Sequence, residues 1–431
     1  MLKACGAESL DELYKDVPAG LRLERAYDLP AALSEVEVRQ WFEKAAEGNT
    51  KLKCFAGFGA YDHYTPAVID ALASRSEYLT AYTPYQPEIS QGTLQYIFEY
   101  QSMMAQLTGL DVCNASMYDG ATATAEAMIM AVNAARKKRR VLISATVHPD
   151  VAAVVSTYAR YHGVALEVVP AKDGAIDREW LSLALKAGDV AGVIVASPNV
   201  YGILEDYTGL ADEVHAVKAL LIVNGPALPL GVLRSPGEWG ADIAVGDAQS
   251  LGMPLNFGGP YLGYMTCTKA LMRKMPGRIV GATCDGRGQR VFVLTLQARE
   301  QHIRREKATS NICSNQGLMT LQAAIYLSLM GPEGLREVNR LSCDNAHELA
   351  RRLEATGKMS LTYPDKPFLN EFCMTIKDGI DRDELYNALL DADILPGVLV
   401  DEDSIVIACT EKNLPEDIDR YTETVANFQQ P

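Results

Sequence analysis

The chain has 431 residues, of which 48% are hydrophobic and 22% charged, and its formal net charge is −15. This composition is ordinary for a soluble globular protein, and the length predicts about two domains. The acidic balance argues against nucleic acid as a main partner, because phosphate binding needs clustered Lys and Arg. No segment approaches the roughly 20 apolar residues of a membrane span, and the nine scattered cysteines predict reduced thiols in the cytoplasm.

Short helices punctuated by Pro18 and Pro30 are expected over the first fifty residues, which carry few apolar side chains. We predict that residues 1–50 form an N-terminal helical arm. From about Lys51 to Thr268, helical and strand-like stretches then alternate. Helices are expected at Thr93–Thr108, at Gly120–Ala135 and around Val151–Tyr161. Strands are expected at Val141–Val147, Ala165–Val169, Gly192–Ala196, Leu220–Val223, Ile243–Val245 and Tyr261–Cys267. Most of these strand runs are apolar without alternation, which predicts an open, mainly parallel sheet covered by helices on both faces.

The character of the sequence changes near Gly331–Pro332, where we place a domain boundary. Beyond it we predict a long helix, Leu335–Ala355, and then Phe372–Ile376 (strand), Asp381–Ala392 (helix), Ser404–Ala408 (strand) and Pro415–Asn427 (helix). A large α/β domain over 51–330, a small α+β domain over 331–431 and the N-terminal arm make the layout of an aminotransferase-like enzyme, the fold type I of pyridoxal phosphate (PLP) enzymes. By itself this layout says little of function, since one fold hosts many chemistries.

PLP enzymes with this layout need a Schiff-base lysine, a carboxylate on the pyridine nitrogen and main-chain N–H groups for the phosphate. The strand that should end in the carboxylate is followed by Asn224, whose amide cannot keep the pyridine protonated. The lysine position falls on or near Ser250, and no lysine occurs from Ala219 to Thr268. Asp119 stands at the expected phosphate loop, where it suits a helix N-cap but repels a phosphate. The sequence therefore predicts a remnant pocket with Asp119, Asn224 and Ser250.

Four stretches carry a specific resemblance to a known family: YTPYQPEISQG (Tyr82–Gly92), NASMYDGAT (Asn114–Thr122), GADIAVGDAQS (Gly240–Ser250) with FGGP (Phe257–Pro260), and AREQHIRREKATSN (Ala298–Asn311). Here the sequence resembles the P-proteins of the glycine cleavage system, and among them the N-terminal-half subunit of the two-chain glycine dehydrogenase (decarboxylating). The resemblance runs from about Leu10 to the C-terminus. Family members usually begin further upstream of Met1–Glu12, so we expect a shorter chain or an earlier start codon.

The resemblance implies an activity and a set of partners. In this family the PLP lysine belongs to subunit 2, so this chain is expected to bind no cofactor covalently. Its expected partners are the PLP-bearing subunit 2, glycine and the lipoylated H-protein, which receives the aminomethyl group after glycine loses CO2. Because the sites of aminotransferase-like enzymes lie at subunit interfaces, loops of this chain are expected to complete the partner's site.

The Tyr82–Gly92 segment is the first candidate for such a loop. Its prolines fix an extended backbone around side chains that offer phenol, amide and carboxylate groups. The candidate catalytic residues, lent to the partner's site, are Tyr82, Tyr85, Gln86 and Glu88. The alternative is a proline-stiffened connection whose tyrosines pack on the core.

The second candidate segment is Lys307–Gln316, where hydroxyl and amide groups follow a basic stretch. Thr309, Ser310 and Asn311 are candidate contacts to the phosphate of the partner's PLP, since small donors suit a phosphate. Ser310 or Asn311 would equally serve as a helix N-cap. No metal site is expected, because no Cys or His spacing fits one.

The sequence leaves two rival hypotheses open. One is a self-sufficient PLP enzyme that uses Lys269 or Lys307, although neither follows a suitable aspartate at the right distance. The other is a catalytically inert scaffold that stabilises the PLP subunit and touches no substrate.

Overall fold

The computed structural model describes residues 1–429, and its internal contacts divide the chain into two compact units, Met1–Lys51 and Leu52–Pro431. The first unit contains the short helices expected from the sequence. They are three 3-10 helices, Leu2–Cys5, Asp11–Tyr14 and Ala19–Leu21, and the α-helix α1, Glu35–Ala46. A capping box starts α1, because the Ser34 hydroxyl accepts from the Glu37 N–H while the Glu37 carboxylate accepts from the Ser34 N–H.

The first unit is richer in apolar side chains than we expected from the sequence. No residue of its helices is buried. Its exposed large apolar residues include Leu10, Leu13, Tyr14, Leu21, Leu23, Tyr27, Leu29, Leu33, Val36, Trp41 and Phe42. The expectation of few apolar residues here is therefore wrong, and the unit presents uncovered apolar surface.

A seven-stranded sheet forms the centre of the second unit, with the strand order β2-β10-β9-β8-β7-β3-β4. The strands are β2 (Val112–Cys113), β3 (Arg140–Ser144), β4 (Ala165–Val169), β7 (Val190–Ala196), β8 (Leu220–Asn224), β9 (Ile243–Asp247) and β10 (Gly263–Cys267). From β4 to β9 every neighbouring pair is parallel. Only β10 breaks this direction, since it runs antiparallel to both β9 and β2. The expectation of a mainly parallel sheet is confirmed.

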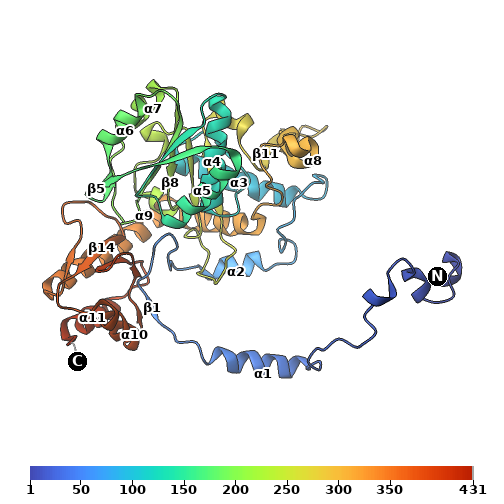
Figure 1. Ribbon diagram of the computed structural model, residues 1–431, viewed down its shortest axis with the longest axis horizontal. Coiled ribbons are helices and arrows are strands. Elements are labelled where there is room, and N and C mark those ends of the chain that lie inside the picture. Colours follow the sequence, from blue (N-terminus) through green and yellow to red (C-terminus); the bar gives the residue numbers. More distant parts are fainter. Residues whose placement is uncertain (430–431) are drawn as a thin grey trace. The chain divides into compact units, whose positions relative to one another are not determined.

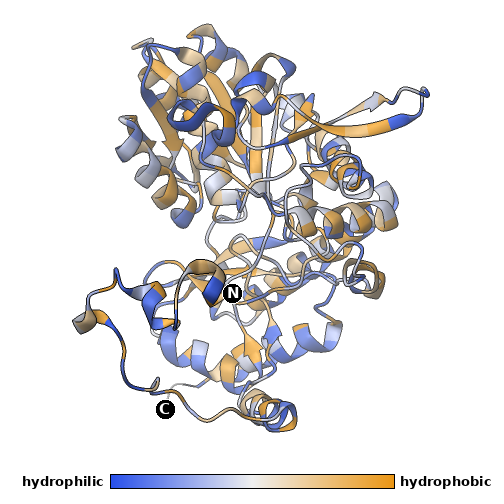
Figure 2. Ribbon diagram, turned by 90° about the vertical axis from the view of Figure 1, so that its right-hand side faces the viewer, coloured by the Kyte–Doolittle hydropathy of each residue, from blue (hydrophilic) through white to orange (hydrophobic). Residues whose placement is uncertain are grey.

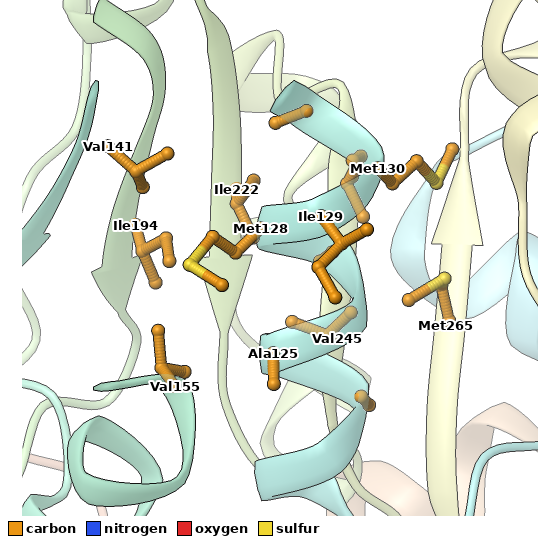
Figure 3. Close-up of a cluster of buried hydrophobic side chains, with 14 of the residues drawn as sticks. Ala125, Met128, Ile129, Met130, Val141, Val155, Ile194, Ile222, Val245 and Met265 are labelled. Carbon is orange, nitrogen blue, oxygen red and sulfur yellow. The ribbon is translucent and has the colours of Figure 1, made fainter. Parts of the chain in front are cut away.

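Helices cover both faces of this sheet, as its apolar strands require (Figure 1). One face is covered by α4 (Gly120–Ala135) and α5 (Pro149–His162), whose side chains Met128, Ile129 and Val155 pack against strand residues such as Ile194 and Val245 (Figure 3). The other face is covered by α6 (Arg178–Leu185) and α7 (Leu210–Ala216). Figure 2 shows the hydrophobic colour along the strands and much of the hydrophilic colour on the surrounding helices.

The helix α9 (Gly317–Ala355) begins eighteen residues before the long helix that we predicted at Leu335–Ala355. The first part of α9 packs against α3 (Gln91–Thr108), and both helices share a hydrophobic core with residues of β9 and β10. Gly331 interrupts the helical backbone with φ 57° and ψ −174°, and Pro332 follows it. The kink lets one continuous segment pack first on the central sheet and then on the C-terminal part of the chain.

The C-terminal part is built on a four-stranded antiparallel sheet with the order β13-β14-β17-β16. Its elements are β13 (Met359–Leu361), β14 (Glu371–Ile376), α10 (Arg382–Asp391), β16 (Val398–Leu399), β17 (Ser404–Ala408) and α11 (Pro415–Asn427). Residues of α9, including Leu349 and Leu353, join its core, to which Phe55 also contributes. The predicted strands and helices of this region are confirmed.

The remaining elements surround these two sheets. They are β1 (Lys53–Cys54) paired with β15 (Ile394–Leu395), α2 (Ala67–Ala73), β5 (Ala171–Lys172) paired with β6 (Ala175–Ile176), the hairpin β11 (Ile279–Cys284) and β12 (Arg290–Thr295), and α8 (Gln301–Arg304). Five further 3-10 helices are Leu228–Gly231, Gly237–Trp239, Lys269–Lys274, Gln297–Arg299 and Arg305–Lys307. Among the described residues, no helix is long and apolar enough to cross a membrane.

Candidate functional site

A cavity of about 260 Å³ lies at the carboxyl ends of the parallel strands. This is the edge at which ligands bind in open α/β sheets. Its lining includes the N-terminus of α4, the last residues of β7, β8 and β9, the residues that follow β7 and β8, and one residue of the C-terminal sheet. The lining side chains that carry polar groups are Tyr61, Asp119, His148, Asp150, Asn199, Asn224, Asp247, Tyr261 and Glu371. No lysine or arginine of the described chain is among the lining residues.

Two carboxylates occupy the N-terminus of α4, where the aminotransferase-like layout would place a phosphate. The Asp119 side chain accepts from the Thr122 N–H at 2.8 Å, and the Asp247 side chain accepts from the Gly120 N–H at 3.2 Å. A Cβ on Gly120 would lie 2.8 Å from the backbone of Gly246 and Asp247, so only glycine allows this approach. The chain therefore fills its own anion site with its own carboxylates.

Asn224 and Ser250 stand where the ring carboxylate and the lysine were sought in the sequence. The Asn224 side chain lines the cavity, and its amide nitrogen donates to the Thr124 hydroxyl at 2.8 Å. Ser250 is 3% exposed and does not line the cavity, and its hydroxyl has no hydrogen-bond partner among the described residues. The structure thus brings Asp119 and Asn224 to the cavity, whereas Ser250 lies buried outside its lining.

Three further carboxyl groups at the cavity, those of Asp150, Asp247 and Glu371, were not predicted from the sequence. Glu371, at the start of β14, accepts from the Phe58 N–H at 2.6 Å and from the Tyr61 hydroxyl at 3.0 Å. Burial raises the pKa of both Glu371 and Asp247 to about 7, against the hydrogen bonds that lower it. Asp247 is the last residue of the buried strand β9, a position at the end of an apolar run that was visible in the sequence. Glu371 is distant along the chain, and no local pattern points to it.

These residues do not fit PLP. A Schiff base needs a lysine at the cavity, and its lining offers none. The pyridine nitrogen needs a carboxylate partner, but the strand that should supply it ends in Asn224, whose amide is bonded to a hydroxyl. A phosphate dianion at α4 would meet Asp119 and Asp247. The residues that line this chain's own cavity therefore lack the groups that PLP chemistry requires.

The Tyr82–Gly92 segment does not line this cavity. Gln91 fixes its end to β12 by paired hydrogen bonds with the main chain of Phe292, at 2.8 and 2.9 Å. Tyr82 is 72% exposed and Tyr85 43% exposed, and Gln86 and Glu88 are exposed as well. None of the four candidate residues is buried, although Tyr85 also contacts Arg278 and His302 of its own chain.

The Lys307–Gln316 segment lies beside the Tyr82–Gly92 segment, since the Thr83 and Ser314 hydroxyls are 3.3 Å apart. The Ser310 hydroxyl donates to the buried carboxyl of Glu126 at 2.7 Å, so its proton is not free for a phosphate. Neither Ser310 nor Asn311 caps a helix, because α9 begins at Gly317; the N-cap interpretation is wrong. Thr309 is half-buried and Asn311 is exposed, so both remain candidate contacts to the phosphate of the partner's PLP.

Lys269 and Lys307, the lysines of the self-sufficient alternative, are both exposed and lie outside the cavity lining. Lys269 opens a 3-10 helix after β10, and Lys307 ends the short 3-10 helix after α8. Neither is placed to form a Schiff base in the cavity.

Comparison with known proteins gives one consistent result. The model of the glycine cleavage system P-protein family matches residues 1–425. The probable glycine dehydrogenase (decarboxylating) subunit 1 of Moorella thermoacetica is 52% identical over 377 residues, which cover 88% of this chain and 84% of that protein. The protein of the same description from Syntrophomonas wolfei is 48% identical over 430 residues, covering 99% and 96%.

Solved structures agree with these relatives. The crystal structure of glycine decarboxylase (P-protein) of the glycine cleavage system, in inhibitor-bound form, superposes with a TM-score of 0.92 at 42% identity, covering 99% of this chain and 96% of that one. A sphingosine-1-phosphate lyase from Burkholderia pseudomallei superposes with a TM-score of 0.68 at 15% identity, which shows the fold alone. The predicted fold class, that of the fold type I PLP enzymes, is confirmed.

Proposed function

The chain belongs to the glycine cleavage system P-protein family, and from this premise we propose that it is the subunit of a two-chain glycine decarboxylase that does not itself hold PLP. In this proposal a second, PLP-bearing subunit 2 supplies the cofactor chemistry by which glycine loses CO2. The aminomethyl group that remains then passes to the lipoyl arm of the H-protein. The chain is active only within this complex, which we place in the cytoplasm.

One observation carries the proposal: carboxylates of the chain itself occupy the N-terminus of α4. Asp119 and Asp247 accept from the main-chain N–H groups at which a cofactor phosphate would bind. A cavity whose α4 amides are occupied by the chain's own carboxyl groups, and whose lining offers no lysine, disfavours a phosphorylated aldehyde and cannot form a Schiff base with it. This arrangement supports a division of labour in which the cofactor lies on the partner.

The exposed loops support a contribution to the partner's site. The Tyr82–Gly92 and Lys307–Gln316 segments adjoin each other, and the first of them presents Tyr82, Tyr85, Gln86 and Glu88 to solvent. Together they offer phenol, amide, carboxylate and hydroxyl groups at one surface. We propose that this surface closes over the partner's cofactor and glycine, with Thr309 and Asn311 near the phosphate.

The test is reconstitution from separately purified chains. Each chain alone and the mixture are treated with PLP and borohydride, and glycine–bicarbonate exchange is measured. We expect no labelled lysine in this chain, labelling of subunit 2, and exchange only in the mixture. Stoichiometric labelling of Lys269 or Lys307 would instead support the self-sufficient enzyme.

The inert scaffold is separated from a contributing subunit by variants of the exposed loop. Glu88→Gln removes one charge at nearly constant volume, so a scaffold should tolerate it with unchanged exchange. If the loop reaches the reacting groups, we expect a loss of roughly tenfold or more in turnover, since tenfold corresponds to only about 1.4 kcal/mol. Subunit association, followed by size-exclusion chromatography, should not change.

A further inference from the structure

A buried guanidinium group lies directly beneath the Tyr82–Gly92 segment. Arg278 precedes β11, and its side chain is only 3% exposed. Its carbonyl accepts from the Ala115 N–H at 2.7 Å, which ties this position to the backbone beside the central sheet. Burying an Arg side chain costs free energy unless the charge is paired, so packing alone does not account for Arg278 at this position.

Glu300 neutralises the charge of Arg278 but does not accept hydrogen bonds from all of its guanidinium N–H groups. Nε of Arg278 lies 3.3 Å from Oε2 of Glu300, and the Glu300 side chain is 6% exposed. Nε and Nη1 of Arg278 and Oε1 of Glu300 nevertheless have no hydrogen-bond partner among the described residues. The pair thus keeps a fixed positive group at this place although hydrophobic replacements would often be at least as stable.

Among the described residues, the only hydrogen bond of the Arg278 side chain goes to Tyr85. Nη2 of Arg278 donates to the Tyr85 hydroxyl at 2.6 Å, and the guanidinium carbon lies 5.2 Å from the centre of the Tyr85 ring. His302 packs edge-on against the same ring at 5.9 Å, and its Nδ1 lies 3.5 Å from Oε2 of Glu300. Arg278, Glu300 and His302 therefore hold one exposed ring in a fixed orientation.

The direction of this hydrogen bond decides what Tyr85 can offer. A guanidinium group only donates, so the Tyr85 oxygen must accept from it. The hydroxyl proton of Tyr85 then points away from Arg278. The Tyr85 residue is 43% exposed, so a group that docks on the loop can approach it, and the proton is available for a second hydrogen bond.

We propose that Arg278 is a positioning residue that fixes the Tyr85 hydroxyl as a hydrogen-bond donor toward the partner's active site. The proposal rests on the proposed function, in which the Tyr82–Gly92 loop reaches that site. Arg278 itself does not touch the reacting groups. It restricts the Tyr85 ring and donates a hydrogen bond to the hydroxyl oxygen before the partner docks. Tyr85 therefore loses less conformational entropy when its hydroxyl forms a hydrogen bond with the partner.

A double-mutant cycle in the reconstituted complex tests this role. The first arm is Tyr85→Phe, which removes only the hydroxyl. The second arm is Arg278→Gln combined with Glu300→Gln, because Arg278→Gln alone would leave a buried carboxylate unpaired. We expect each arm to lower the turnover of glycine–bicarbonate exchange roughly tenfold. We expect their combination to be no worse than either arm, because both remove the same interaction.

Arg278→Lys and an exposed pair provide the controls. Lysine keeps the cation near the ring but not the planar donor geometry, so we expect turnover between that of the wild type and of the glutamine variant. Arg75→Gln with Glu77→Gln removes an exposed pair joined at 2.8 Å and should leave turnover unchanged. Thermal melts identify any variant that loses activity through unfolding. If the Arg278→Gln, Glu300→Gln variant unfolds, Arg278→Lys takes its place as the second arm of the cycle.

The possible results separate this proposal from the proposed function. No exchange in the wild-type mixture would overturn the proposed function. An active mixture in which Tyr85→Phe is neutral would overturn the role of Arg278, because there would be no hydroxyl to position. Losses that simply add would show that Arg278 acts apart from Tyr85 and would overturn it as well. Only a non-additive cycle supports the proposal.

Discussion

Burial raises the pKa of Glu126 on α4 to about 7, above its ordinary value of 4.5, and the hydrogen bond from Ser310 only partly offsets this effect. A carboxyl group whose pKa is raised on folding stabilises the fold fully below pH 4.5. That contribution is lost as the pH rises through about 7, because the folded state then has to bury a charge. Asp247 and Glu371 contribute in the same direction.

Glu126→Gln should therefore make the isolated chain more stable at pH 8 and change little at pH 5. Glutamine keeps an oxygen that accepts from Ser310 and removes the charge. We expect a gain of roughly 1–3 kcal/mol at pH 8, because one unit of pKa shift corresponds to about 1.4 kcal/mol. Thermal melts across this pH range provide the measurement, with the exposed Glu99→Gln as control. An equal gain at both pH values would show that the buried charge is not its cause.

At the scale of elements, the N-terminus of α4 determines what the cavity accepts. Ser250→Lys combined with Asn224→Asp restores the residue types that a PLP site needs, yet we expect no Schiff base. Ser250 lies outside the cavity lining, and Asp119 and Asp247 still hold the α4 amides. Absorbance near the Schiff-base band after addition of PLP is the measurement. A stoichiometric internal Schiff base in this variant would show that the carboxylates do not exclude the phosphate.

The kink in α9 depends on one glycine. Gly331 has φ 57° and ψ −174°, which is unfavourable for any residue with a Cβ, although a Cβ there would meet no atom within 4 Å. Gly331→Ala should therefore destabilise the chain by roughly 1–3 kcal/mol through backbone strain alone. Gly92→Ala is the matched control, since Gly92 lies in α3 without positive φ and with open space around it. It should be neutral or slightly stabilising in the same denaturation experiment.

The elements with strong periodicity were predicted best. The bounds of Gly120–Ala135 and Pro415–Asn427 agree with α4 and α11. The first half of α9 was missed because Gly331 and Pro332 read as a helix break, whereas here they produce a kink. An apolar run does not reveal strand direction, so the antiparallel β10 was not foreseen. The hairpin β11–β12 was missed although its turn contains Asp285 and Gly286.

The candidate site was predicted only in part, for a physical reason. Asp119 was found because it precedes a clearly helical segment, and Asn224 because it ends an apolar, strand-like run. Glu371 and Arg278 act through partners more than 190 residues away along the chain. A single sequence has no local signal for such contacts, since they arise from tertiary packing.

At the scale of the whole molecule, the uncovered apolar surface of the first unit predicts assembly. Residues such as Tyr27, Trp41 and Phe42 are exposed in the isolated chain, and such surface favours a protein partner. We expect co-expression with the PLP-bearing subunit to give a heterodimer or a dimer of heterodimers in size-exclusion chromatography. Deletion of residues 1–51 should weaken this association while the rest of the chain stays folded, as circular dichroism would report. Two independent monomers at micromolar concentration would contradict the expectation.

The carboxylates at the start of α4 also bear on how the stability of each subunit responds to the cofactor concentration. A ligand that binds only the folded state raises stability in proportion to the logarithm of its concentration. If, as we propose, the cofactor lies on the partner and Asp119 and Asp247 keep the amides that would hold a phosphate, PLP does not directly stabilise the fold of this chain. Its own folding equilibrium then has no direct dependence on the PLP concentration, whereas a cofactor-bearing partner would lose stability as PLP becomes scarce.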